Sequence, residues 1–237
     1  MIFAMIKYHL LVLIREPLNL FFGLGLPFLN LFILSSNLEY SGSLDAYLPA
    51  LLIVAAIVLC FTDSASSHAY ARQIKFLRLL RMTPATSKTY IFTGILSRLI
   101  ALFVLTVTLT IVMVIFFDVS LSGRNWPLFL AVLVLTFIMF YLISMFIANA
   151  LKGAKNSQNL VYVTFFLLLI VGGLMLPLGA MPDMLQTIAT NLPPMFAINI
   201  LQSAWMGTDI FYGHSFIAVT AITAVFALLS IKFFKFE

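Results

Sequence analysis

The chain has 237 residues, of which 63% are hydrophobic and only 9% are charged, with a formal net charge of +5. Soluble domains average roughly 45–50% apolar and about 25% charged residues, so this composition predicts a polytopic membrane protein and excludes a sizeable soluble catalytic domain. The basic residues lie in loops beside apolar runs, so membrane topology explains the positive charge, and nucleic-acid binding is set aside. The single Cys60 lies in an apolar run and permits no internal disulfide.

The first segment, residues 1–16, is apolar but carries Lys7 and His9, which predicts a helix lying at the membrane interface. Pro17 then marks a joint before the first span, residues 18–36. Glycines inside this span predict either close helix packing or a functional hinge. The next loop holds acidic residues and no basic one, and is expected outside the cell.

The second and third spans are predicted at residues 48–67 and 90–117, and each carries a charge near its cytoplasmic boundary. Asp63 lies in a polar run that ends the second span, and Arg98 lies at a similar depth in the third. Two interpretations remain open. The side chains form an ion pair between adjacent spans, or each one reaches the lipid headgroups separately.

Residues 71–83, between these spans, form the only long basic and amphipathic segment of the chain. Plotted at about 100° per residue, its apolar and basic side chains separate onto opposite arcs, which predicts a helix lying flat on the cytoplasmic surface. Thr83 and Pro84 are expected to close this helix. Physical reasoning alone favours a solvated helix that touches lipid headgroups.

Three further spans are predicted at residues 127–151, 160–177 and 215–231, with Pro127 opening the first of them. Between the last two spans, prolines divide residues 178–213 into pieces too short to cross the membrane. A re-entrant helical hairpin on the external side fits this pattern best. An amphipathic loop on the outer leaflet is the alternative.

The resulting fold is an all-α polytopic membrane protein with six transmembrane helices and both termini in the cytoplasm. In this topology every Lys and Arg except Arg124 falls on the cytoplasmic side, as the positive-inside rule requires. Trp126 and Trp205 both fall at the external border, where an aromatic belt is expected.

No motif for chemistry appears in the chain. A GxxxxGK[ST] phosphate-binding loop is absent, so ATP is not expected to bind here. His9, His68 and His214 are far apart in the sequence and are placed in loops or interfaces on opposite sides, so we expect neither a metal site nor a catalytic residue. The chain is expected to be a non-enzyme without a cofactor of its own.

Three segments together resemble the ABC-2 type exporter permeases, the membrane subunits of one class of ATP-binding cassette transporter. They are the REP that ends the first segment, the basic run LRLLRMTPATSKTY, and a late stretch that follows the pattern P-x-x-L-x-x-I-A-x-x-L-P. The resemblance covers the whole chain. One departure is the sequence HAYARQ before the basic run, where relatives often carry Glu and Gly.

This resemblance implies a permease that forms a homodimer, or a heterodimer with a similar chain, above two copies of a separate ATPase subunit that binds ATP and Mg²⁺. It implies a multi-pass protein of the cell membrane, expected to be bacterial. Residues 71–83 would be the coupling helix that docks on the ATPase, in preference to a solvated loop. The residues assigned to this contact are Arg72, Lys75, Phe76, Leu77, Arg78, Leu80, Arg81, Thr83 and Pro84.

The expected activity is outward transport of a hydrophobic or amphipathic cargo, such as a drug, antibiotic, lipid or small peptide. Few charges in the spans and no external domain favour this cargo class. A lipid-linked glycan is the second choice, and a membrane scaffold or binding subunit without transport is the alternative of a different class. Candidate residues along the cargo path are Phe21, Phe22, Asn30, Asp63, Phe165 and Phe166.

Overall fold

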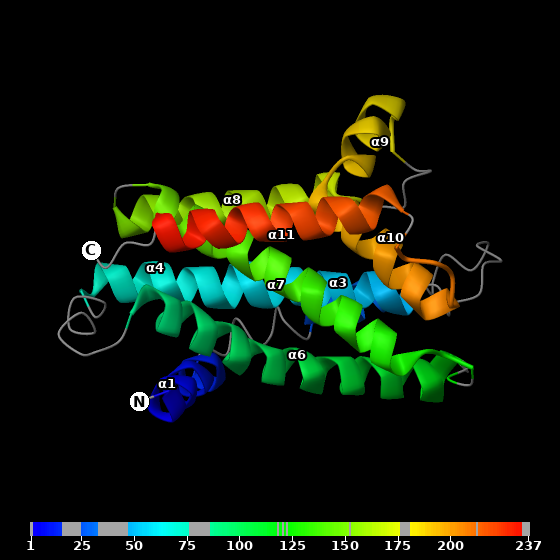
Figure 1. Cartoon of the computed structure of the whole chain (residues 1–237), viewed down its shortest axis with the longest axis horizontal. Coiled ribbons are helices and arrows are strands. Elements are labelled where there is room, and N and C mark those ends of the chain that lie inside the picture. The colour runs from blue at the N-terminus through cyan, green and yellow to red at the C-terminus, as the bar shows by residue number, and fades with distance from the viewer. Residues whose placement is uncertain are drawn as a thin grey trace.

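The structure, a computed structural model, is built of helices packed into an elongated bundle (Figure 1). No strand occurs in the part of the chain that it describes. The described residues are 2–15, 25–32, 47–75, 86–117, 119, 121, 123–151, 153–175, 181–211 and 213–233.

One long helix forms the centre of the bundle. It consists of α3 (Tyr47–Val58), the π-helical turn η2 (Leu59–Ala65) and α4 (Ser66–Gln73), which follow one another without a break. Nearly every residue of α3 and η2 is buried, because neighbouring helices surround them. The second span is therefore longer than the predicted 48–67 and continues into the segment that was expected to form a separate helix.

Four further long helices build the bundle: α6 (Ser87–Phe117), α7 (Trp126–Ala150), α8 (Ala154–Val171) and α11 (His214–Lys232). The first three pack against the central helix, and α11 packs on α7. Helix α7 crosses the central helix and also packs against α8 and α11 (Figure 1). The Ser230 hydroxyl of α11 donates to the Leu142 carbonyl of α7 at 2.8 Å. The outer faces of α6 and α11 expose many large apolar side chains, as lipid-facing helices do.

Capping residues explain where two of these helices begin. Asn125 accepts a hydrogen bond from the Leu128 amide at 3.2 Å, and Pro127 occupies the first turn of α7, as predicted for this span. Helix α8 begins at Ala154, earlier than the predicted position 160. Gly153 precedes it with a φ of 96°, a conformation that suits glycine and turns the chain from α7 into α8.

Among the described residues, four helices are long and apolar enough to cross a membrane: Tyr47–Gln73, Lys88–Phe117, Trp126–Ala150 and His214–Lys232. Helix α8 is a shorter apolar helix. Of the predicted first span, residues 25–32 are helical and the remainder lies outside the described residues. The chain is thus a helical membrane protein, and the count of six spans stays a prediction.

The predicted external region, residues 178–213, contains two helices, α9 (Asp183–Thr190) and α10 (Pro193–Met206). Helix α10 packs against α3, α7 and α11, whereas α9 projects from the bundle and exposes most of its side chains (Figure 1). The two pieces are helical, as expected. Their depth in the membrane, and hence the re-entrant arrangement, stays a prediction.

The first helix, α1 (Ile2–Arg15), packs against the N-terminal half of α6 (Figure 1). Its inner face buries Met5 and His9, while Phe3 and Leu11 are exposed. The packed face of α1 therefore includes a buried polar residue, His9.

Candidate functional site

Polar side chains concentrate at one end of the bundle, which we call the basic end. It comprises η2 and α4, α6 as far as Arg98, and the C-terminal part of α7 with the turn into α8, with α1 packed beside them (Figure 1). The helices that carry these polar groups are mainly apolar over the rest of their length, so the polar groups stand out at this end. The basic end is therefore the candidate functional site.

The ion pair between Asp63 and Arg98 lies at the centre of this site. Arg98 Nε donates to Asp63 Oδ2 at 2.8 Å, and the two side chains are 2% and 1% exposed. Arg98 also donates to the Ser97 hydroxyl at 3.1 Å. Neither side chain reaches the surface. Of the two interpretations, the structure therefore shows the ion pair between adjacent spans, and not two charges that reach the lipid headgroups separately. Buried charges need such a partner.

The π-helical turn η2 places Asp63 where it meets α6. Three hydroxyls bond back to carbonyls of this widened turn: Thr62 to Val58 at 2.8 Å, Ser64 to Leu59 at 3.2 Å, and Ser66 to Phe61 at 3.4 Å. These bonds satisfy the three buried hydroxyls within the helix itself. Single π-helical turns occur often at functional sites. The polar run was visible in the sequence, but its π-helical geometry was not.

Beyond η2, α4 is fastened to the ends of α7 and α8. His68 Nε2 lies 3.1 Å from Asn149 Oδ1, and Arg72 Nη1 donates to the Ala148 carbonyl at 2.8 Å and to the Ser157 hydroxyl at 3.4 Å. His68 and Arg72 are four residues apart, so they share one face of α4. This face packs on α7 and α8.

Arg72 was expected to contact the ATPase, but the structure buries it against α7 and α8, and the residue is only 7% exposed. The sequence analysis treated residues 71–83 as a new helix. Instead α4 carries the chain through Arg72 to Gln73, and Lys75, which is exposed, has a φ of 60°, a left-handed conformation that ends a helix. The other predicted contact residues lie outside the described residues: Phe76, Leu77, Arg78, Leu80, Arg81, Thr83 and Pro84.

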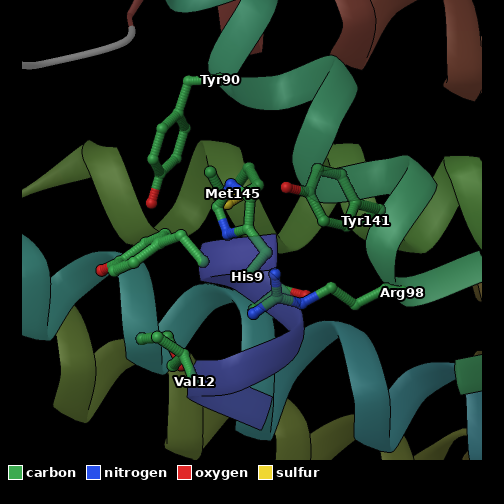
Figure 2. A pocket seen from close by; sticks show the side chains of 9 residues that line it. His9, Val12, Tyr90, Arg98, Tyr141 and Met145 are labelled. Carbon is green, nitrogen blue, oxygen red and sulfur yellow. The ribbon is translucent and has the colours of Figure 1, made fainter. Parts of the chain in front are cut away.

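The two histidines of the N-terminal half, which are far apart in the sequence, both contact Tyr90. Ring centroids are 5.0 Å apart for His9 and Tyr90, and 5.5 Å apart for His68 and Tyr90. Figure 2 shows Tyr90, Tyr141 and Arg98 arranged around His9. The separation in sequence hid this cluster, because the packing of α1 on α6 brings His9 back to the bundle. In the described part of the chain no three His, Cys, Asp or Glu residues are grouped to hold a metal ion.

Burial lowers the pKa of His9 to about 3, and the nearby charges of Arg98 and His68 add to this effect. An undocked α1 would have a His9 pKa near 6.5. The docked state is therefore fully favoured above pH 6.5, and docking weakens as the pH falls from 6.5 toward 3, because only the undocked histidine takes up a proton.

We expect α1 to undock more often in mild acid. In a Cys60→Ala background, the maleimide labelling rate of Met5→Cys, which is buried, is divided by that of Phe3→Cys, which is exposed. This ratio should rise roughly tenfold between pH 7.5 and pH 5.5, because each pH unit below the undocked pKa changes the equilibrium about tenfold. His9→Gln, which cannot titrate, should give a flat ratio, and an equal rise in this variant would contradict the prediction.

Close contact between α6 and α7 at the basic end depends on Gly94. A Cβ atom built on Gly94 would overlap the Tyr141 hydroxyl, which is buried against it. Gly94→Ala is therefore expected to lower the free energy of unfolding by about 1–3 kcal/mol, the usual cost of overpacking. Tyr141→Phe in the Gly94→Ala background should restore part of this loss. Unfolding in mixed detergent micelles measures both, and equal stability of Gly94→Ala and the parent would contradict the steric argument.

The structure describes four of the six proposed cargo-path residues. Asn30 donates to the Leu174 carbonyl at 2.5 Å and so ties residues 25–32 to the end of α8, whereas Asp63 belongs to the ion pair. Phe165 is buried and Phe166 is exposed on α8, with ring centroids 5.3 Å apart. Phe21 and Phe22 lie outside the described residues.

The opposite end of the bundle is closed by an aromatic cluster. Trp205 of α10 is fully buried, with ring centroids 5.4 Å from Trp126 and 5.0 Å from Phe129. Arg124 lies over the Trp205 ring at 4.8 Å and donates to the Trp205 carbonyl at 3.1 Å. The sequence placed both tryptophans at one border, but their direct contact depends on how α10 packs.

The chain matches a known protein family. The family model described as ABC-2 type transporter matches residues 1–206, which include every helix described above except α11. No curated protein gives a significant match to the chain.

Proposed function

Because the chain belongs to the ABC-2 type transporter family, we propose that it is the permease subunit of an ATP-binding cassette exporter. Members of this family are membrane transport subunits that associate in general with an ATP-binding cassette subunit. The family match over residues 1–206 is the observation that carries the proposal. Outward transport, driven by ATP hydrolysed in a separate subunit, is the activity that we infer from it.

The energy is proposed to enter through the stretch predicted as the coupling helix, residues 71–83, and within it through the segment that joins α4 to α6. Both flanks of this segment support such a role. Before it, Arg72 and His68 fasten α4 to α7 and α8. After it, Thr86 caps α6 by accepting a hydrogen bond from the Thr89 amide at 3.2 Å. A partner that displaces the segment would therefore move rigid helices on both sides.

We propose the following assembly. Two permease chains, identical or similar, lie above two ATPase subunits that bind ATP and Mg²⁺. The basic end faces the cytoplasm, six spans cross a bacterial cell membrane, and residues 178–213 lie on the external side. The concentration of Lys and Arg at the basic end supports this orientation.

The proposed cargo is a hydrophobic or amphipathic molecule: a drug, antibiotic, lipid or small peptide. The two charges buried between the second and third spans, Asp63 and Arg98, neutralise each other, so the pair offers no net charge to a ligand. The exposed faces of α6, α8 and α11 are apolar. Both features support a cargo that partitions into the bilayer.

The test is co-expression of this chain with the product of the neighbouring gene, expected to be the ATPase, followed by purification and reconstitution into proteoliposomes. The proposal expects a stoichiometric complex and nucleotide-dependent transport of an amphipathic dye. The control replaces the phosphate-loop Lys of the ATPase with Ala, which should leave the complex intact and stop transport. Stable purification of this chain with no ATPase bound would favour a scaffold and overturn the proposal.

A further inference from the structure

A small cavity at the basic end is lined by residues of five elements, one of which is α4 with Ser67. Helix α1 contributes His9, η2 contributes Ser64, α6 contributes Tyr90 and Arg98, and α7 contributes Met145 (Figure 2). Its volume is about 10 Å³. A cavity of roughly 10–15 Å³ holds one water molecule, so this space is too small for any organic ligand.

One residue that lines this cavity has a buried nitrogen without a hydrogen-bond partner in the described part of the chain. His9 is 4% exposed, and its Nε2 has no hydrogen-bond partner among the described residues. Leaving a buried polar atom unsatisfied is unfavourable, and native proteins commonly place a water molecule beside such an atom. The other walls supply the further partners that a buried water needs: the Ser64 and Tyr90 hydroxyls and the Arg98 guanidinium.

The charges around the cavity indicate that its occupant is neutral. The positive charge of Arg98 is already paired with Asp63 at 2.8 Å, so an anion would gain little there. A cation would be repelled by Arg98 and would find the histidine nitrogen as its only basic ligand on this wall. A water molecule satisfies both His9 and the hydroxyls without adding charge.

We propose that this cavity is a binding site for one water molecule, which hydrogen bonds His9 Nε2 and joins α1 to the second, third and fourth spans. Through this water, α1 is attached to the bundle by hydrogen bonds to a molecule that exchanges with solvent. It also links the N-terminal helix to the guanidinium of the central ion pair. This site is independent of the cargo and of the ATPase.

Hydroxyl-radical labelling by short X-ray pulses tests this site, because radicals formed from a bound water oxidise the side chains beside it. Two methionines of α7 provide a matched pair: Met145 is 1% exposed and lines the cavity, whereas Met139 is 0% exposed and does not line it. In the full-length protein in micelles, mass spectrometry should find Met145 converted to its sulfoxide while Met139 stays unmodified. Oxidation of Met145 no faster than that of Met139 would mean a dry cavity and would overturn the proposal.

Two kinds of variant identify the role of His9. His9→Gln keeps a nitrogen near the position of Nε2 and should preserve oxidation of Met145, whereas His9→Leu should reduce it to the Met139 level. If His9→Leu releases α1, the buried Met5 on the same helix will also be oxidised. In that case Val12→Leu distinguishes loss of the water from release of α1, because it adds a methylene at the cavity wall and should displace the water. This variant should abolish Met145 oxidation while Met5 stays protected. Unchanged Met145 oxidation in Val12→Leu would overturn the site.

Discussion

Asp63→Ala is expected to destabilise the protein by about 3–5 kcal/mol, because it leaves the charge of Arg98 buried without a partner. The side chains are almost fully buried and share one 2.8 Å contact, so loss of the carboxylate leaves the guanidinium in the interior without a countercharge. Helix α6 would then separate from the central helix at the basic end. The measurement is the free energy of unfolding in mixed detergent micelles, together with the yield of folded protein in the membrane.

Three comparisons make this prediction specific to the pair. Exchange of the charges, Asp63→Arg with Arg98→Asp, should recover part of the stability that either reversal alone removes. Replacement of both by apolar residues, Asp63→Leu with Arg98→Met, should cost less than Asp63→Ala, because no unpaired charge remains. Asp209→Ala, at an exposed position, is the control and should have little effect. Single reversals that are each harmless would show that the pair does not matter.

Hydropathy predicted the long helices well because membrane thickness imposes their length. The apolar runs around Arg98 and after Pro127 became α6 and α7 with ends close to those expected. Pro127 and Asn125 gave a local start signal that the tertiary structure preserves. The external prolines likewise separated α9 from α10 at Pro193.

The candidate site was less accessible to sequence reasoning, because it depends on helix rotation. A π-helical turn adds one residue to a turn and rotates everything after it, yet it leaves the hydropathy profile unchanged. Arg72 was placed on a surface arc because its helix was assumed to start at residue 71. In the continuous helix the same residue faces α7 and α8, and its guanidinium bonds Ala148 and Ser157.

Contacts between distant segments were also beyond the reach of pattern analysis. His9 lies on a helix whose sequence predicts only an interfacial position, and its contact with Tyr90 appears once α1 docks on α6. Such a contact could have been suspected from a single feature, a histidine on the apolar side of an amphipathic helix. The cluster of Trp126 and Trp205 has a comparable hint, since both residues were assigned to one membrane border.

The contacts at the basic end determine how a movement of α4 would spread through the proposed exporter. The central helix is clamped to α6 by Asp63, and to α7 and α8 by His68 and Arg72. The π-helical turn carries the first of these contacts, Asp63, and joins α4 to α3, whose residues are nearly all buried. A displacement at the end of α4 would therefore be shared among three neighbouring helices, with η2 as the element best able to change its hydrogen bonding.

Loss of transport is the expected result of reversing the charge of the proposed coupling segment. The variant combines Arg78→Glu and Arg81→Glu with Leu80→Asp, which removes two basic groups and one apolar anchor from the surface proposed to contact the ATPase. Because the segment is flanked by α4 and α6, whose contacts are made by other residues, insertion and folding should be unaffected. Transport in proteoliposomes should fall to the level of the phosphate-loop variant of the ATPase, and the ATPase should no longer co-purify.

The matched control is Lys232→Glu, a charge reversal at the exposed end of α11, also on the proposed cytoplasmic side. It alters the net charge of the basic end without touching the segment between α4 and α6, so transport should persist. Loss of transport in both variants would indicate a general charge effect and not a docking surface. Full transport in the triple variant would show that the ATPase acts on this chain elsewhere, since two introduced carboxylates and a buried aspartate at a protein interface cannot be neutral for binding.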